Sequence, residues 1–294
     1  MKENIDEEER GGRREERREG GERGGGGDSK IAEGGGVRTH QVAVCGSNTH
    51  AWHPAFTGID LKPRDRVLVG ETEWGGNLSA IAHLCRRSGA IMEVVPSNSA
   101  GAMDIAALRG MLDDDVRAVC VTLAPAVNGL VNDIARIAEA LQGHDAWLFV
   151  DAAQSFGQVS IDLSHPRFDV TTVSARKYLR APRGTGFGVY SKRFLAQVDP
   201  SGIDQTSGPW LGNCPQVRSD ARKFEYGESA FAFRLGLEAS VSQALTRDRH
   251  AIRDSLATLA AQPLAPLPSL PVFHFQHKLY PPCLLFTSYF PLRL

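Results

Sequence analysis

The sequence predicts an α/β fold with a mostly parallel β-sheet that is covered by helices on both faces. From about residue 37 onward, short apolar runs typical of buried strands alternate with longer stretches of helical periodicity. Strands that alternate with helices form βαβ units, and such units build parallel sheets. Ligands of these sheets bind at the carboxyl ends of the strands. The polar segments that follow the predicted strands are therefore the candidate site.

Each strand is predicted from a run of apolar and β-branched residues, and each helix from an amphipathic pattern. The helix over 77–90 is the clearest, because Gly89 is a suitable C-cap. The predicted strands are VAVC (42–45), RVLVG (66–70), IMEVV (91–95), VRAVCVTL (116–123), AWLFV (146–150), DVTTVS (169–174) and GFGVY (186–190). A helix is also expected after the first strand through Trp52, and over 103–112, 133–142 and 230–247.

Both ends of the chain differ in composition from the part between them. Residues 1–36 are rich in glycine and mixed charge and have no aromatic residue, so we expect a disordered segment. Residues 37–260 are expected to form one ligand-binding domain. Residues 261–294 are rich in proline, have no helical or strand period, and are predicted to be an irregular tail.

Composition excludes several classes of protein. The chain has 294 residues, 42% of them hydrophobic, and a formal net charge of -1, so no overall field favours nucleic acid or a membrane surface. No apolar run reaches the ~20 residues of a membrane span. Its cysteines have no CxxC or zinc spacing, which favours free thiols in a reducing, cytoplasmic compartment. No metal site is expected.

Two charged residues follow predicted strands in the segment 150–190. Asp151 comes directly after AWLFV, where an unpaired carboxylate is costly, and Gln154 follows it closely. Lys177 comes just after DVTTVS, beside Arg176. Taken singly, Asp151 is more simply a helix cap or a loop ion pair, and Lys177 a solvated charge. A lysine that is partly desolvated beside other cations, however, becomes an amine nucleophile that can form a Schiff base.

The segment GSNTHAW (46–52) lies between a predicted strand and a helix. Its small residues and the helix N-terminus suit a phosphate, although such turns are common in α/β proteins. A phosphate site, an acid for a ring nitrogen and an imine-forming lysine together describe pyridoxal phosphate. The sequence therefore predicts this cofactor, with Asp151 keeping its ring protonated.

Residues 40–245 resemble the class V aminotransferases, a family of fold type I enzymes that depend on pyridoxal phosphate and include cysteine desulfurases and isopenicillin N epimerase-like proteins. The resemblance rests mainly on VDAAQSFGQVSIDL and FDVTTVSARKYLRAPRGTGFGVY, with the family's interval between aspartate and lysine. It implies the large domain of a fold type I transferase, a small amino-acid substrate and a homodimer. The C-terminal small domain of the family is expected to be largely missing here.

The resemblance also implies roles for single residues. Lys177 would be the Schiff-base lysine and proton shuttle, and it is the one predicted catalytic residue. The remaining cofactor-binding residues would be Asp151 at the ring nitrogen, Gln154 at the ring hydroxyl, Trp74 stacked on the ring, Asn48, Thr49, Ser174 and Arg176 at the phosphate, and Ser229 at the phosphate across the dimer interface.

Two features leave the reaction open. We find no equivalent of the arginine that grips the substrate carboxylate in the family, and neither Cys214 nor Cys283 has the context of a desulfurase cysteine. We therefore expect an enzyme that acts on an amino acid at Cα, as a transaminase or as a lyase or isomerase of the desulfurase or epimerase kind. The alternative is a truncated, catalytically silent homologue that binds the cofactor or serves as a scaffold.

Overall fold

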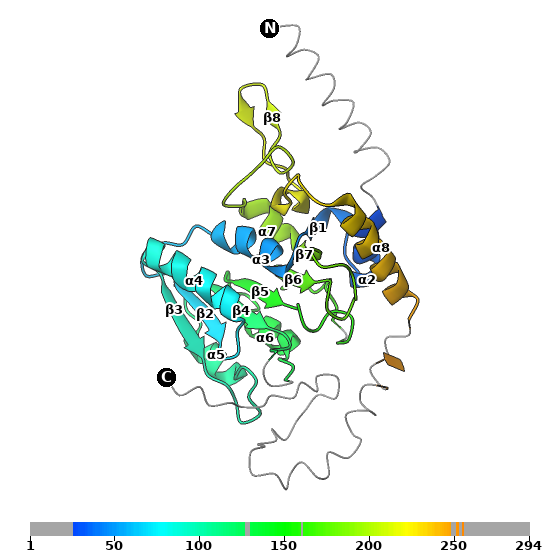
Figure 1. Cartoon of the computed structure of the whole chain (residues 1–294). Helices are drawn as coiled ribbons and strands as arrows, with labels where there is room; N and C mark the ends of the chain where they lie inside the picture. The colour runs from blue at the N-terminus through cyan, green and yellow to red at the C-terminus, as the bar shows by residue number, and fades with distance from the viewer. Residues whose placement is uncertain (1–25, 127–129, 160, 248–250, 253–254, 256–294) are drawn as a thin grey trace, which may run out of the picture.

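A seven-stranded sheet forms the centre of the chain. The computed structural model describes residues 26–126, 130–159, 161–247, 251–252 and 255. The order of strands across the sheet is β1-β7-β6-β5-β4-β2-β3 (Figure 1). The strands are β1 (Val42–Cys45), β2 (Arg66–Gly70), β3 (Ile91–Val95), β4 (Val116–Thr122), β5 (Trp147–Asp151), β6 (Val170–Ser174) and β7 (Gly186–Tyr190).

The sheet is mostly parallel, as the sequence predicts. Strands β3, β2, β4, β5 and β6 pair in parallel, while β7 pairs antiparallel with both β6 and β1. All seven strands of the sheet lie within a residue or two of the predicted runs. Most of them are short apolar segments buried on both faces, whereas the edge strand β3 is partly exposed. The parallel strands end at one edge of the sheet, and this edge carries the candidate site.

Helices cover both faces of the sheet, which confirms the predicted layers. One face packs against α3 (Asn48–Thr57), α4 (Gly75–Ser88) and α7 (Lys192–Gln197), through buried rings such as Trp52 and Phe194. The other packs against α2 (Gly26–Gly35), α5 (Ile105–Met111), α6 (Ile134–Ala140) and α8 (Phe231–Leu245). Gly89 ends α4 in the left-handed conformation at φ 76°, as expected for its C-cap.

The predicted disordered segment 1–36 is wrong for its last residues. Residues 26–35 form helix α2, which packs beside α8 (Figure 1). Ile31 is fully buried, in the same core cluster as Leu237 and Val241 of α8. The local sequence is poor in helix formers, so tertiary packing rather than propensity accounts for this helix. Residues 1–25, and the predicted irregular tail 261–294, lie outside the described residues.

A hairpin of two short strands, β8 (Trp210–Leu211) and β9 (Cys214–Pro215), projects from the body of the molecule (Figure 1). Trp210 and Leu211 are exposed on it, as is the free thiol of Cys214. The thiols of Cys45, Cys85 and Cys120 are buried and free, as the sequence suggests. Within the described ranges, no helix has the length and apolar character needed to cross a membrane.

Candidate active site

Three polar residues end the central parallel strands. Thr122 ends β4, Asp151 ends β5 and Ser174 ends β6, and all three are buried. Thr122 lies directly opposite Asp151 in the strand register. Because parallel strands present their carboxyl ends at the same edge, these side chains define one location on the molecule.

Asp151 is held by three neutral donors. Its Oδ2 accepts hydrogen bonds from Asn48 Nδ2 and Asn77 Nδ2, each at 2.9 Å, and its Oδ1 accepts one from the backbone N–H of Ala153 at 2.9 Å. Burial raises the pKa of Asp151, while these hydrogen bonds and the charge of Lys177 act in the opposite direction. This buried acid is thus fixed in position and would be stabilised further by a protonated partner.

Lys177 lies in the turn after β6 and is half-buried. Desolvation lowers its pKa, with a smaller lowering from Arg176, whereas Asp151 raises it. The neutral amine is therefore more populated than in an exposed lysine, as a nucleophile requires. The next turn is strained at Arg180, whose φ of 59° lies in the left-handed region. The Arg180 N–H donates to the Lys177 carbonyl at 3.0 Å, which joins this turn to the lysine.

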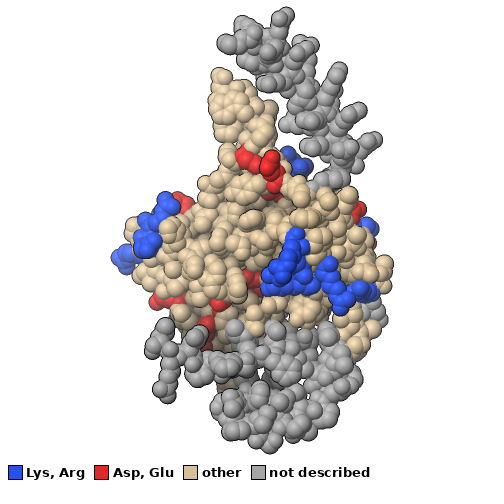
Figure 2. Space-filling view, in the orientation of Figure 1, with Lys and Arg blue, Asp and Glu red and all other residues tan. Residues whose placement is uncertain are grey.

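A basic surface surrounds this turn. Arg176, Arg180 and Arg183 are exposed. Figure 2 shows Lys and Arg side chains gathered near the middle of the face drawn, in the region of the loop that follows β6. Such a surface attracts anions, so it suits a ligand that carries phosphate and carboxylate groups.

The turn between β1 and α3 offers backbone N–H groups to an anion. Ser47 caps α3 by accepting a hydrogen bond from the His50 N–H at 3.1 Å. Asn48 is the first residue of α3, and Thr49 beside it is half-buried. The side chain of Asn48 donates one hydrogen bond to Asp151, so it contacts the acid as well as lying at the predicted phosphate position.

Gly186 of β7 packs directly against this turn. A Cβ at Gly186 would lie 2.6 Å from the carbonyl carbon of Ser47 and 2.9 Å from the backbone N of Asn48. Both contacts are shorter than Cβ atoms adopt, so only glycine fits here. The glycine-rich start of β7 therefore sets the position of the anion-binding turn.

Trp74 is not part of the core. Its side chain is 53% exposed at the start of α4, and its Nε1 would lie 2.7 Å from a Cβ built on Gly76. The small residue at 76 leaves room for the indole. Trp74 is joined to the site through its backbone N–H, which donates to Thr122 Oγ1 at 3.1 Å. A ring exposed at this edge is free to stack on a planar ligand.

Gln154 and Ser229 are less closely tied to Asp151. Gln154 is half-buried after β5, and its carbonyl accepts a hydrogen bond from Gln158 Nε2 at 2.6 Å. Ser229 is exposed before α8, and its Oγ accepts from Arg234 Nε at 2.8 Å. The structure thus joins Ser229 to Arg234, while its predicted role at a phosphate stays a prediction.

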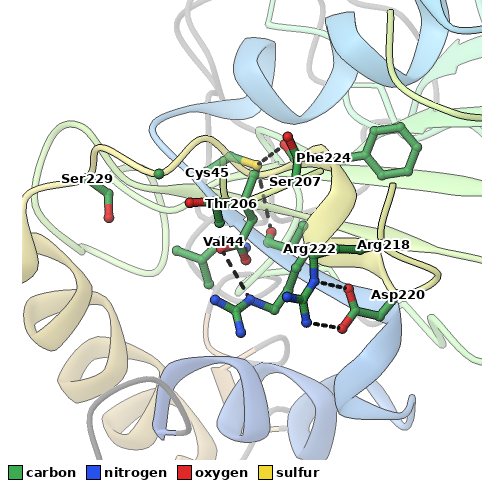
Figure 3. A network of polar contacts seen from close by, with 12 residues as sticks. Val44, Cys45, Thr206, Ser207, Arg218, Asp220, Arg222, Phe224 and Ser229 are labelled. Atoms are coloured by element: carbon green, nitrogen blue, oxygen red, sulfur yellow. Dashed lines mark hydrogen bonds and ion pairs between the residues drawn. The ribbon is translucent and has the colours of Figure 1, made fainter. Parts of the chain in front are cut away.

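Arg234 continues this contact to the edge strand of the sheet. Its Nη2 donates to Glu225 Oε2 at 2.9 Å, and Glu225 Oε1 accepts from the Val44 N–H at 2.7 Å. Figure 3 shows Ser229 and the polar groups near β1, among them the Cys45 thiol directed at the Phe224 carbonyl. The segment before α8 is thereby fastened to the strand that leads into the anion-binding turn.

Sequence reasoning missed three residues of the site. Glu73 Oε1 accepts hydrogen bonds from the Trp74 N–H at 3.1 Å, from Asn77 Nδ2 at 2.8 Å and from Thr122 Oγ1 at 2.9 Å. Burial, followed by the charge of Asp151, raises the pKa of Glu73 to about 7. One signal was available, because Thr122 ends a strand. Glu73 precedes α4, so helical spacing could not pair it with Asn77.

These groups fit pyridoxal phosphate. Asn48 Oδ1 is buried and has no hydrogen-bond partner in the described part of the chain, so the pocket holds unused polar capacity beside Asp151. The donor set matches the three parts of the cofactor. It provides a buried carboxylate for the ring nitrogen, a half-buried amine for the aldehyde, and a helix N-terminus for the phosphate.

Solved structures with this fold include enzymes of sulfur amino acids. A mutant of C-DES with glycine covalently linked to its pyridoxal-phosphate cofactor superposes with a TM-score of 0.76 at 20% identity, covering 84% of this chain and 66% of that one. The cysteine desulfurase CsdA from Escherichia coli also gives a TM-score of 0.76 at 20% identity, covering 84% and 63%. At this identity the likeness shows a shared fold, and it is the fold type I architecture that the sequence predicts.

Curated relatives are similar over part of their length. The cysteine desulfurase of Enterobacter sp. (strain 638) is 28% identical over 218 residues, which is 70% of this chain and 51% of that protein. The cysteine desulfurase of Dickeya dadantii (strain 3937) is 28% identical over 233 residues, which is 76% and 53%. This chain thus spans about half the length of these relatives.

The family model described as "Aminotransferase class-V" matches residues 28–284. The match begins within α2, and it extends past residue 260, the predicted end of the ligand-binding domain. It covers most of the chain and both strand ends that carry Asp151 and Lys177. The chain therefore belongs to the aminotransferase class-V family.

Proposed function

We propose that this chain binds pyridoxal phosphate through Lys177 and acts on an amino acid at Cα. One observation carries the proposal: the buried carboxyl of Asp151 ends β5, and the half-buried amine of Lys177 lies in the turn after the neighbouring strand β6, where each shifts the pKa of the other. Structural charges of this kind normally pair directly or face water. Here the carboxylate accepts only from neutral donors among its hydrogen bonds, which leaves it suited to a cationic ring.

Pyridoxal phosphate, when bound, supplies an aldehyde for an amine and a protonated ring that withdraws electrons from Cα. Asp151 would hold the proton at the ring nitrogen. Lys177, with its lowered pKa, would bind the aldehyde and then take or return the Cα proton, because a lowered pKa increases the neutral fraction of the amine and only the neutral amine acts as a base. Trp74 would cover the ring and exclude water.

The phosphate and hydroxyl groups would be held by residues around these two. The backbone at Asn48 and Thr49 would bind the phosphate at the start of α3, with Ser174 and Arg176 beside it. Gln154 would bond the ring hydroxyl. Ser229 would serve the site of a second subunit in a homodimer, so light scattering should give twice the mass of the chain.

The substrate class follows from the relatives. Since the curated relatives named above are cysteine desulfurases, cysteine and related sulfur amino acids are the first substrates to test. Cys214, on the exposed hairpin, is the one accessible free thiol among the residues described. Its variant Cys214→Ala tests whether sulfur transfer passes through a protein thiol.

A spectrum of the purified chain tests the proposal. Incubation with pyridoxal phosphate should give a visible band that Lys177→Ala lacks, and borohydride reduction followed by peptide mass analysis should find the adduct on Lys177. The matched control is Lys192→Ala, because Lys192 starts α7 away from the site. Absence of any lysine-dependent band would refute the proposal. A band that no amino acid alters would favour a silent, cofactor-binding homologue.

A further inference from the structure

Two carboxyl groups share one amide in the interior of the candidate site. Asn77 Nδ2 donates to Glu73 Oε1 at 2.8 Å and to Asp151 Oδ2 at 2.9 Å. Glu73 is 8% exposed and Asp151 is 3% exposed. Two negative charges this close in a low-dielectric interior repel strongly, so the pair favours holding one proton.

The hydrogen bonds indicate which carboxyl takes that proton. Both oxygens of Asp151 accept from donors, and Lys177 adds a positive charge nearby. Glu73 accepts three bonds on Oε1, but its Oε2 is buried without a partner in the described part of the chain. A bare anionic oxygen costs more to bury than a neutral hydroxyl. Protonation therefore costs less free energy at Glu73 than at Asp151, so Glu73 is the neutral member of the pair.

We propose that Glu73 is a positioning residue that carries the proton of this pair and, through Asn77, holds Asp151 ionised under the cofactor ring. This inference rests on the proposed function only in assigning a cofactor to the site, because the proton on Glu73 and its hydrogen bond with Asn77 belong to the protein alone. Glu73 binds β2, β4 and α4 together at one point, since it bonds Thr122 of β4 and both Trp74 and Asn77 at the start of α4.

Other titratable groups face Glu73 from each neighbouring element. Asp151 comes from β5, and Lys177 acts on Asp151 from the turn after β6. Cys120 of β4 interacts with Glu73, but burial raises the pKa of its thiol, so it stays neutral. On α3, burial lowers the pKa of His53 toward the neutral form. Asp151 is therefore the charge that controls Glu73.

The sign of the pH effect follows from these contacts. The folded pKa of Glu73 is raised to about 7 from 4.5, so the folded state binds more protons than the unfolded state between those values. The contribution to stability is complete below about 4.5 and is lost as the pH rises through about 7. Glu73→Gln cannot titrate, so its stability should lack this fall, whereas the wild type should show it.

Infrared titration of the cofactor-free protein tests the location of the proton. Asp28→Asn removes a further buried carboxyl whose pKa is raised, to about 6, so the titration uses this background. The protein should then show, at pH 6, the C=O stretch of one buried carboxylic acid that disappears near pH 7. Glu73→Gln should lack this band. Asp151→Asn should keep it with a lower titration midpoint, because burial still raises the pKa of Glu73 while the charge of Asp151 is gone. The proposal is overturned if the band persists in Glu73→Gln and vanishes in Asp151→Asn. It is equally overturned if the folded Asp28→Asn protein shows no such band.

Cofactor binding tests the positioning role of Glu73 separately. Gln at 73 retains an oxygen that accepts from Asn77 and Thr122, so Glu73→Gln should bind pyridoxal phosphate within about threefold of the wild type. Glu73→Ala removes the acceptor for Asn77 and Thr122. It should weaken binding about tenfold, the effect of losing one buried hydrogen bond. Equal weakening by both variants would refute positioning. A protein that shows the infrared band but binds no cofactor would instead refute the proposed function alone.

Discussion

Arg234 is predicted to stabilise the fold through a buried ion pair. It is the close partner of Glu225, whose side chain is fully buried, at 2.9 Å. Arg222 is the second cation, but its Nε lies 3.9 Å from Glu225 Oε2 and its side chain is 43% exposed. The change Arg234→Met keeps the apolar stem and removes the charge, which leaves the carboxylate with the Val44 N–H and a distant arginine.

The expected loss follows from this geometry. Removing one partner of a buried pair costs about 3–5 kcal/mol. The lower end applies, since Arg234 is 27% exposed and Glu225 keeps the bond from Val44. We expect a loss of about 3 kcal/mol in the free energy of unfolding, which for a chain of this size lowers Tm by about 6–12 °C. Arg222→Met, the matched control, should cost no more than about 1 kcal/mol.

Urea unfolding followed by circular dichroism measures both variants, provided that the slope m stays constant. Adding Glu225→Gln to Arg234→Met should recover about 1 kcal/mol, because the amide still accepts from Val44 but carries no charge. Equal losses in Arg234→Met and Arg222→Met would refute the reasoning. So would a double variant less stable than Arg234→Met.

Three further outcomes are expected. Trp74→Ala should weaken binding of pyridoxal phosphate about tenfold through lost stacking, as measured by fluorescence titration, and leave Tm within about 2 °C in a thermal melt. Trp210→Ala on the hairpin should change neither the affinity nor Tm. Gly186→Ala should lower the free energy of urea unfolding by about 1–3 kcal/mol through its clash with the β1–α3 turn, while Gly110→Ala, with open space on α5, should raise it by about 0.5–1 kcal/mol. Burial raises the pKa of Asp28 to about 6 from 3.8, so stability from this group is lost as pH rises through that window, and Asp28→Asn should be more stable than wild type at pH 7 but not at pH 3.5 in thermal melts.

The sheet was predictable because its information is local. The central strands are short and largely apolar runs. Asp151 ends β5 and Lys177 follows β6 by three residues, so both are visible in the sequence. Helix α2 was not predictable in the same way, because GGDSKIAEGG has weak helical preference and becomes a helix through the burial of Ile31 against α8. Its stability comes from residues about 200 positions away in the sequence.

The site was predictable only where a residue acts by its own type. An acid and a lysine at strand ends indicate chemistry by themselves. Asn77 does not, because its importance depends on lying between two carboxyls from different elements. Asn48 shows the same limit, since its position at the start of α3 suggested a phosphate, while its side chain turns to Asp151.

The contacts of β1 with β7 and with Glu225 also determine when the site can form during synthesis. β1 pairs only with β7 in the sheet, and its Val44 N–H bonds Glu225, 181 residues later in the chain. Contacts of such long sequence separation form late, because closing the loop between them costs chain entropy first. The turn at 46–48 leaves the ribosome early, yet it gains its final position only after residues near 225 have emerged. A nascent chain released before that point would carry Asp151 and Lys177, but its β1–α3 turn would not be fixed in position.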